Sequence, residues 1–258
     1  MKQNSDFRQL NVDQLRVKIY PDDISMGHAA ADLVEQTLVS TIDRQGWANL
    51  VLATGASQFT FYEALKNKQS ILWPNVTVFH LDEYAGMSDQ HPASFRKYLK
   101  DRILNFIKPG KVHLMQGDAD NLEQEALRYE ELMEKVNIDL ACIGIGENGH
   151  IAFNDPPVAD FRDPRLVKIV KLDEPCRLQQ LGEGWFPTLN DVPTHAISMT
   201  VTGIMRSKKI CCVVPDKRKA GAVYQALYGP VSEKCPASIL RRHEDCTLFL
   251  DNRSASSL

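Results

Sequence analysis

The chain has 258 residues, of which 43% are hydrophobic and 24% charged, so it is long and apolar enough for one large globular domain that needs no disulfide or metal to hold it together. Its net charge of −3 argues against a nucleic-acid platform, which requires an extended basic face. No stretch approaches the ~18 apolar residues of a membrane span, and the N-terminal MKQNSDFRQL has no apolar run that would serve as a signal peptide. We therefore expect a cytoplasmic protein with no nucleic-acid or membrane partner.

The six cysteines indicate no disulfide framework or metal site. None of them forms a CxxC pair, so zinc-ribbon and thioredoxin-type sites lack their spacing. Cys142, Cys211 and Cys212 lie in apolar runs typical of buried strands. A reduced cysteine in such a run behaves as a small hydrophobic residue, which fits a cytosolic protein.

Short apolar runs alternate with longer amphipathic stretches through the first 145 residues. The predicted strands are 16–20, 49–54, 76–81, 112–115 and 138–145. Helices are predicted after Asp22 and Asp23, near Ser57, near Pro92 and over 122–136. One face of the first helix is apolar at four-residue spacing, as a buried face requires; its residues are Met26, Ala30, Val34, Leu38 and Ile42.

The pattern changes after residue 155 and resumes near residue 196. Residues 155–193 are rich in Pro, Asp and Gly but include Trp185 and Phe186, so we expect an ordered lid over 156–193 rather than a linker. Strands are then predicted at 196–201, 208–214 and 246–251, with a helix over 217–227. This alternation predicts a single α/β domain over 1–258, with a mostly parallel sheet covered by helices on both faces. Ligands of such sheets bind beyond the carboxyl ends of the strands.

The first informative strand end is TGAS, which comprises Thr54, Gly55, Ala56 and Ser57. Small residues let the backbone approach a ligand, and two hydroxyls with the N–H groups of a helix start suit a phosphate. The stretch is neither a GxxxxGK[ST] loop nor a GxGxxG fingerprint, so nucleotide binding has no support. A plain capped strand–helix turn is the alternative.

The second strand end carries the adjacent carboxylates Asp82 and Glu83. Both cannot turn into the core, and a carboxylate that faces a crevice is tuned by burial toward a general base. A solvated pair, or a helix cap further along, is the alternative. His80 and His91 flank the pair without the spacing of metal ligands, so no metal site is predicted.

The third strand end is GIGENGHIAFNDPP, residues 144–157. Gly144, Gly146 and Gly149 permit a sharp turn. Histidine is a residue type that can pass a proton in both directions at physiological pH, which suits His150 to acid/base work, and Asp155 can hold its imidazole in one tautomer. Together the three strand ends suit a phosphorylated small molecule that undergoes proton transfers.

At these residues the sequence resembles the glucosamine-6-phosphate deaminase (isomerase) family, whose wider superfamily includes 6-phosphogluconolactonases. The resemblance covers nearly the whole chain and is carried by LATGAS at 52–57, VFHLDEY at 78–84 with HPASF at 91–95, and GIGENGHIAFNDP at 144–156. The lactonases have a GHTAS-like version of the histidine motif, which this chain lacks.

The resemblance implies a Rossmann-like three-layer fold and conversion of glucosamine 6-phosphate and water to fructose 6-phosphate and ammonia, without metal or organic cofactor. It implies that Asp82 is the base that moves the C2 proton to C1. It also implies that His150 assists ring opening with Asp155 behind it. The turn 54–57 and Lys219, in DKRKA, would hold the phosphate.

Three departures from the family pattern qualify the resemblance. The family's typical Asp two residues before the histidine is here Asn148, and its typical Glu is the shorter Asp155. Galactosamine-6-phosphate deaminases can also carry Asn at the position of Asn148, so galactosamine 6-phosphate, the C4 epimer, stays open as the substrate. The family's lid arginine aligns with Glu183, for which Arg177 is the nearest replacement. Arg165 and Lys168 only loosely echo the allosteric residues of the family, whose members include hexamers, dimers and monomers, so a homo-oligomer also stays open.

Two other functions compete with a deaminase. A sugar-lactone hydrolase on the same fold would use His150 to activate water and would not need Asp82. A non-catalytic sugar-phosphate sensor, suggested by Asn148 and Glu183, would be stabilised by ligand without turnover.

Overall fold

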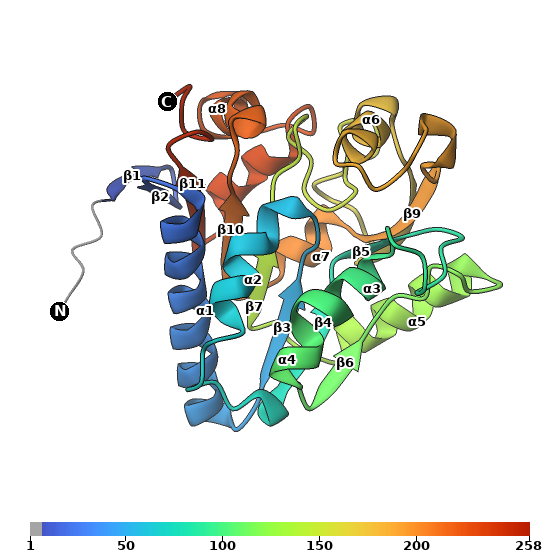
Figure 1. The fold of residues 1–258 in the computed structure, drawn as a ribbon, viewed down its shortest axis with the longest axis horizontal. Helices are drawn as coiled ribbons and strands as arrows, with labels where there is room; N and C mark the ends of the chain where they lie inside the picture. Colours follow the sequence, from blue (N-terminus) through green and yellow to red (C-terminus); the bar gives the residue numbers. More distant parts are fainter. Residues whose placement is uncertain (1–6) are drawn as a thin grey trace.

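The computed structural model describes residues 7–258 and contains one eight-stranded sheet and one three-stranded sheet (Figure 1). The large sheet has the order β1-β2-β11-β10-β7-β3-β4-β6, and only the β1–β2 pair is antiparallel. Its strands are β1 (Arg8–Val12), β2 (Leu15–Tyr20), β3 (Ala48–Leu52), β4 (Val76–His80), β6 (Lys111–His113), β7 (Leu140–Ile143), β10 (Ile210–Val214) and β11 (Cys246–Asp251). The predicted α/β class with a mostly parallel sheet is confirmed.

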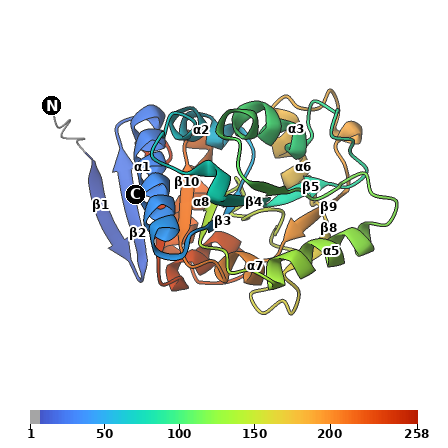
Figure 2. The ribbon, with the colours of Figure 1, turned by 90° about the horizontal axis from the view of Figure 1, so that it is seen from below.

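Helices cover both faces of the large sheet, so the fold has three layers (Figure 2). The helices α1 (Asp23–Gln45) and α2 (Phe59–Leu65) pack on one face, and α5 (Leu122–Glu134), α7 (Val201–Met205) and α8 (Ala220–Tyr228) pack on the other. Two hydrophobic cores result because alternate residues of each strand point to opposite faces. Neighbouring residues of β3 show this, since Leu50 belongs to the α1 side and Val51 to the α5 side.

The helix α1 illustrates how sequence sets these layers. Its Asp22 cap accepts a hydrogen bond from the Ser25 backbone N–H at 2.7 Å, and it ends at Gly46, which has the left-handed φ of 87°. All five residues of its predicted apolar face are buried. Burial at four-residue spacing therefore fixed which side of the helix meets the sheet.

The remaining helices are short. They are α3 (Phe95–Leu99), α4 (Asn105–Ile107) and α6 (Glu174–Gly182), the 3₁₀ helices η1 (Ala56–Gln58), η2 (Trp73–Asn75), η4 (Leu189–Asp191), η5 (Lys217–Lys219) and η6 (Pro236–Arg242), and the π-helix η3 (Lys100–Leu104). The helices predicted near Ser57 and from residue 217 thus begin as the 3₁₀ turns η1 and η5. None of the helices in residues 7–258 is long and apolar enough to cross a membrane.

A smaller antiparallel sheet lies beyond the carboxyl end of β4. It has the order β5-β9-β8, with β5 (Asp82–Tyr84), β9 (His195–Met199) and β8 (Val167–Lys171). The segment 156–193 contributes β8, α6 and η4, and packs through an apolar cluster that it shares with β5 and α3, which includes Tyr84, Phe95, Phe153, Cys176 and Phe186. The sequence pattern predicted neither α6 nor this second sheet.

Candidate active site

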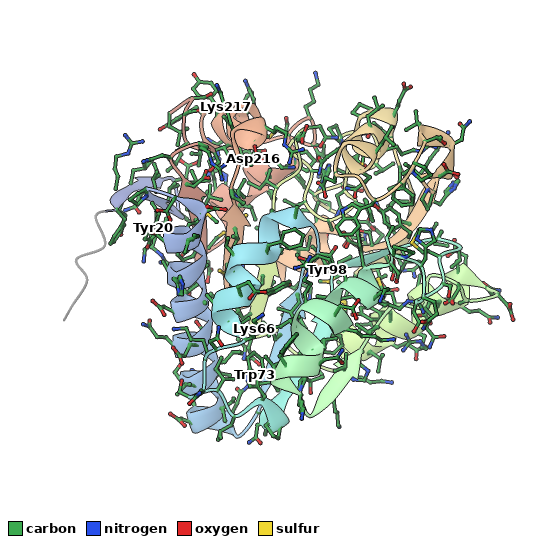
Figure 3. All side chains as sticks on the ribbon, viewed as in Figure 1. Tyr20, Lys66, Trp73, Tyr98, Asp216 and Lys217 are labelled. Atoms are coloured by element: carbon green, nitrogen blue, oxygen red, sulfur yellow. The ribbon has the colours of Figure 1, made fainter. Side chains whose placement is uncertain are left out.

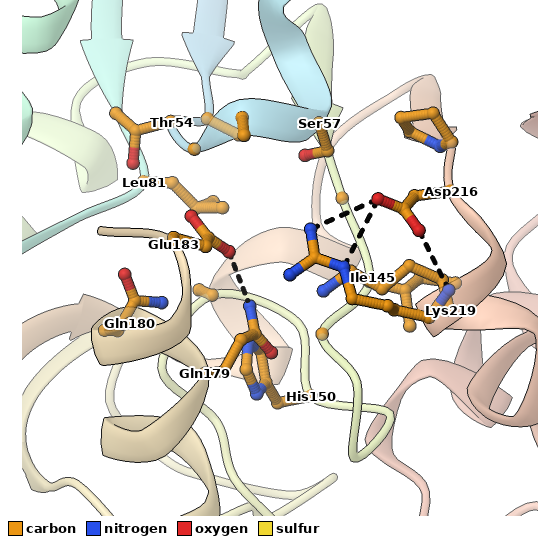
Figure 4. Close-up of a pocket in the computed structure, with 18 of the residues that line it drawn as sticks. Thr54, Ser57, Leu81, Ile145, His150, Gln179, Gln180, Glu183, Asp216 and Lys219 are labelled. Carbon is orange, nitrogen blue, oxygen red and sulfur yellow. Dashed lines mark hydrogen bonds and ion pairs between the residues drawn. The ribbon is translucent and has the colours of Figure 1, made fainter. Parts of the chain in front are cut away.

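One cavity lies at the carboxyl ends of β3, β7 and β10 and against β5, with a volume of about 180 Å³. The predicted strand-end residues Asp82, His150 and Thr54–Ser57 line it together with Lys219. Figure 4 shows Thr54 and Ser57 on one side, Gln179 and Gln180 from α6 on a second, and Asp216 with Lys219 on a third. The cavity therefore lies where ligands of parallel sheets bind, beyond the carboxyl ends of the strands.

The turn after β3 shapes one wall of the cavity. Gly55 has φ = 96°, which an L-residue rarely adopts, and its carbonyl accepts a hydrogen bond from the Tyr98 hydroxyl at 2.8 Å. The Ser57 hydroxyl accepts a hydrogen bond from Gln58 Nε2 at 3.0 Å. The turn thus presents two hydroxyls and a tightly bent backbone to the cavity, as a small anion requires.

Lys219 supplies a buried positive charge beside this turn. Its side chain sits in η5, directly after β10, and the residue is only 6% exposed. Within residues 7–258 no carboxylate oxygen lies within 4.0 Å of its Nζ. Burial lowers the pKa of Lys219, and the charges of Glu183 and Glu147 oppose that shift. A buried ammonium without a counterion that lines a cavity is suited to an anionic ligand.

Strand β5 separates the two adjacent carboxylates. Asp82, 6% exposed, lines the cavity, and no group within residues 7–258 donates a hydrogen bond to its carboxylate. Burial and the neighbouring charge of Glu83 raise the pKa of Asp82 well above its usual value. A carboxylate held in this way is a stronger base than one in water, as general-base chemistry requires.

Glu83 faces the opposite side of β5 and is fully buried. It accepts hydrogen bonds from Ser94 Oγ at 2.9 Å and from the backbone N–H groups of Phe95 and Arg96 at 3.1 and 2.9 Å. Burial raises the pKa of Glu83, and these donors with the Tyr84 N–H oppose the shift. Because every partner is a donor, the arrangement suits the ionised carboxylate. Glu83 therefore caps the start of α3, the structural role that the sequence left open for one of the pair.

The glycines after β7 bring the His150 ring into the cavity wall. The Gly146 N–H donates to the His150 carbonyl at 2.9 Å, and Gly149 turns the chain with φ = 86°. A Cβ atom on Gly146 would lie 2.2 Å from the His150 ring. Only glycine at residue 146 therefore leaves room for the imidazole.

Asp155 and Asn148 hold His150 from behind. Asp155 Oδ1 lies 2.8 Å from His150 Nδ1 and accepts a hydrogen bond from Asn148 Nδ2 at 2.9 Å, while Asn148 Oδ1 accepts from the His150 backbone N–H at 3.0 Å. Burial alone would raise the pKa of Asp155, but its hydrogen bond and charge interaction with His150 lower it. Nδ1 is thus engaged by the carboxylate, which leaves Nε2 for a ligand.

Cys176 on α6 completes this buried cluster. The donor atoms of His150, Asp155 and Cys176 lie within 4.8 Å of one another, and among residues 7–258 they form the one group of three such residues that could hold a metal ion. The 2.8 Å His150–Asp155 contact is the length of a hydrogen bond, and burial raises the pKa of the Cys176 thiol. The cluster therefore matches a protonated network better than a metal site.

Helix α6 contributes cavity residues that sequence reasoning missed. Gln179 and Gln180 line the cavity, beside Glu183, which the resemblance aligned with the family's lid arginine. Gln180 accepts a hydrogen bond from the Tyr84 hydroxyl at 2.7 Å, and Gln179 accepts one from the Glu147 backbone N–H at 2.9 Å. The signal was weak because one apolar turn in a Pro- and Gly-rich stretch resembles a loop.

The structure does not bring Arg177 to the cavity, which corrects the expectation that it replaces a lid arginine. Its guanidinium donates to the carbonyls of Leu189 and Val192, because residue 177 lies on the side of α6 that packs against η4. Arg218 and Asp216 line the cavity instead. They belong to the DKRKA stretch, so the motif that pointed to Lys219 carried this signal too.

Arg165 and Lys168 serve structural contacts. Arg165 pairs with Glu130 of α5 at 2.5 Å, and Lys168 pairs with Asp163 at 2.8 Å. Both cations are therefore engaged within the chain.

Comparison with known proteins agrees with this geometry. A sequence model of the family described as glucosamine-6-phosphate isomerases/6-phosphogluconolactonase matches residues 21–249. A glucosamine-6-phosphate deaminase from Exiguobacterium sp. is 40% identical over 80% of this chain and 79% of its own length. Glucosamine-6-phosphate deaminase 1 from Bacillus subtilis is 36% identical over 88% of this chain and 94% of its own length.

Solved structures give the same relationship. A glucosamine-6-phosphate deaminase described as monomeric superimposes with a TM-score of 0.86 at 33% identity, over 94% of this chain and 99% of that one. The 6-phosphogluconolactonase of Trypanosoma brucei has a TM-score of 0.77 at 14% identity, over 97% and 100% of the two chains, and so shares the fold. The chain belongs to the glucosamine-6-phosphate isomerase/6-phosphogluconolactonase family.

Proposed function

We propose that the protein is an amino-sugar-phosphate deaminase that converts glucosamine 6-phosphate and water to fructose 6-phosphate and ammonia. The observation that carries the proposal is the content of one cavity, in which His150 is backed by Asp155 and, among residues 7–258, the Asp82 carboxylate has no hydrogen-bond donor and the Lys219 ammonium no ion-pair partner. A base, an acid/base and an anion site are the groups that this reaction requires.

His150 is assigned to opening of the sugar ring. Its Nε2 takes the proton of the O1 hydroxyl and then gives a proton to O5, which breaks the C1–O5 bond and forms the aldehyde. Asp155, 2.8 Å from Nδ1, stabilises the imidazolium that exists between these two transfers. Asn148 carries no charge and instead fixes the loop, because its amide joins the His150 backbone to the Asp155 carboxylate.

Asp82 is assigned to the proton transfer between neighbouring carbons. Its carboxylate takes the C2 proton of the open sugar and returns it at C1. The aldehyde oxygen O1 gains the proton that the C2 amine loses, so the aldehyde becomes a hydroxyl and the amine becomes an imine. Water then adds at C2 and ammonia leaves, so no metal or organic cofactor is required. The phosphate is held by the turn Thr54, Gly55, Ala56 and Ser57 and by Lys219.

The lactone hydrolase is the less favoured alternative. The related structures described as 6-phosphogluconolactonases share only 14–19% identity with this chain, whereas the related deaminases reach 33–40%. The cavity also holds a buried base, Asp82, for which lactone hydrolysis has no use. The galactosamine epimer remains the second candidate substrate, on account of Asn148.

The test is ammonia release by the purified protein with glucosamine 6-phosphate, galactosamine 6-phosphate and their N-acetyl forms, each at millimolar level. Ammonia from one free amine, abolished in Asp82→Asn, supports the proposal and identifies the epimer. Hydrolysis of 6-phosphogluconolactone that survives in Asp82→Asn would instead establish the lactonase. Thermal stabilisation by every sugar phosphate without turnover would indicate the sensor.

We further propose a cytoplasmic location, supported by six cysteines that all remain free, including the paired neighbours Cys142 and Cys211 on adjacent strands. A homo-oligomer stays a prediction that light scattering after gel filtration would check, and one related deaminase is described as monomeric.

A further inference from the structure

We propose that Arg218 is the second cation of the phosphate site, and that it supplies the charge that α6 does not. The proposal rests on the proposed function, because it names a residue that selects a phosphorylated substrate. Arg218 lines the same cavity as Lys219 and follows β10 in the same 3₁₀ turn.

The first argument for this role is the balance of charges in the cavity. Figure 4 shows Glu183 and Lys219 entering the cavity from opposite walls. The Glu183 charge acts on Lys219 strongly enough to oppose the effect of burial on its pKa. A phosphate dianion placed between them meets one positive and one negative charge, which cancel to first order. A second cation is therefore needed before a phosphate is favoured over a hydroxyl group.

The second argument is that the present contacts of Arg218 are weak. Its Nε and Nη2 donate to Asp216 Oδ2 at 3.3 and 3.2 Å, and its Nη1 lies 3.5 Å from Glu147 Oε1. The side chain is 48% exposed, and its best bonds are to a residue two positions away. These are long, solvent-accessible contacts, which cost little to exchange for a charge-assisted bond to phosphate. Asp216 thus keeps the guanidinium at the cavity until a ligand arrives.

The third argument is that hydrogen bonds and ion pairs connect Arg218 to α6. Glu147, the partner of Arg218 Nη1, binds Gln179 through its backbone N–H, and Gln179 Nε2 donates to Glu183 at 3.1 Å. Movement of Arg218 toward a phosphate removes a charge partner from Glu147. Glu183 also interacts with the charge of Arg218, so a guanidinium bound to the phosphate offsets the repulsion between the phosphate and the Glu183 carboxylate.

The test compares Arg218→Gln with Lys217→Gln, a matched loss of one charge at the adjacent residue. Lys217 is exposed, lies at the outer edge of the molecule near Asp216 (Figure 3), and does not line the cavity. Calorimetric titration with inorganic phosphate measures the anion site without turnover. We expect Arg218→Gln to weaken phosphate binding by about tenfold or more, Lys217→Gln to leave it unchanged, and Glu183→Gln to strengthen it.

Kinetics separate phosphate recognition from a structural role. Arg218→Gln should raise KM for the sugar phosphate by about tenfold or more with kcat nearly unchanged, and should not alter the KM for unphosphorylated glucosamine. Arg218→Lys should restore part of the loss. Unchanged phosphate binding and KM in Arg218→Gln, with ammonia still released, would overturn the role of Arg218 and leave the deaminase intact. Arg218-dependent phosphate binding without ammonia release would do the reverse.

Discussion

The adjacent carboxylates Asp82 and Glu83 should affect stability in opposite directions when each is replaced by its amide. Glu83 is fully buried and accepts five hydrogen bonds, from Tyr84 N, Phe95 N, Ser94 Oγ, and Arg96 N and Nε. In Glu83→Gln an NH₂ group replaces one oxygen and meets donors that it cannot accept from. Breaking a buried charged network of this kind costs about 3–5 kcal/mol, which for a chain of this size lowers Tm by roughly 10 °C.

Asp82→Asn should instead raise the stability at neutral pH. Burial and the Glu83 charge raise the pKa of Asp82, so the folded protein holds this proton more tightly than the unfolded chain does. Stability is therefore lost as pH rises through the window between the unfolded and the folded pKa. The uncharged Asn removes that loss, and the gain should disappear in acid, where Asp82 is protonated in both states.

Thermal and guanidinium unfolding of the wild type, Asp82→Asn and Glu83→Gln between pH 4 and pH 8 would measure both effects. The reasoning is refuted if Asp82→Asn lowers Tm at pH 8, or if Glu83→Gln leaves Tm unchanged. A control at Glu233, which is exposed on a loop, should leave Tm unchanged when replaced by Gln.

Three further predictions concern the cavity. The value of kcat/KM should rise with pH through the raised pKa of Asp82, because the base must be ionised. A pH profile of kcat/KM that instead rises at the ordinary carboxylate pKa of about 4 would contradict this. Gly146→Ala should lower kcat by about 100-fold, because its Cβ would displace the His150 ring; a ring whose NMR signals and activity are unaltered would argue against this crowding. Asp216→Gly should raise the unfolding free energy by about 1 kcal/mol, because Asp216 has the strained φ of 85°. The same change removes the carboxylate that binds the Arg218 guanidinium. A lower Tm would show that the hydrogen bond from Arg218 N to the Asp216 carboxylate outweighs the strain.

The elements that bury their apolar residues in a regular pattern were predictable. Strands at 16–20, 76–81 and 246–251 and the apolar face of α1 appear where periodicity places them. Strand β5 was not predictable, because its three residues are held by pairing with β9, more than a hundred residues later. Strand β1 was missed for a related reason, since its side chains are mostly exposed and it is stabilised by pairing with β2.

The site divides in the same way. Residues at strand ends could be predicted because the sheet topology brings them together, and Asp82, His150 and Lys219 do line one cavity. The separate roles of Asp82 and Glu83 could not, because they depend on the direction of β5 relative to α3. The contributions of Glu183 and Arg218 depend on how an irregular segment packs, which no local pattern encodes.

Helix α6 and the residue after it bear on which substrate the cavity accepts, rather than on the proton transfers. In the proposed mechanism the proton transfers depend on Asp82 and His150, which follow β4 and β7. Gln179, Gln180 and Glu183 reach the same cavity from the segment 156–193, whose apolar residues pack in a cluster shared with β5 and α3. Gln179 and Gln180 are hydrogen-bonded to Glu147 and Tyr84, on the segments that carry His150 and Asp82. Substitution of Glu183 can therefore alter which charge is accepted with less effect on those segments. Cys176 on the same helix is also tied to the site, because it lies against Asp155. Substrate selectivity should accordingly be easier to change at residue 183 than at residues 176, 179 or 180, which makes the end of this short helix the place to redesign it.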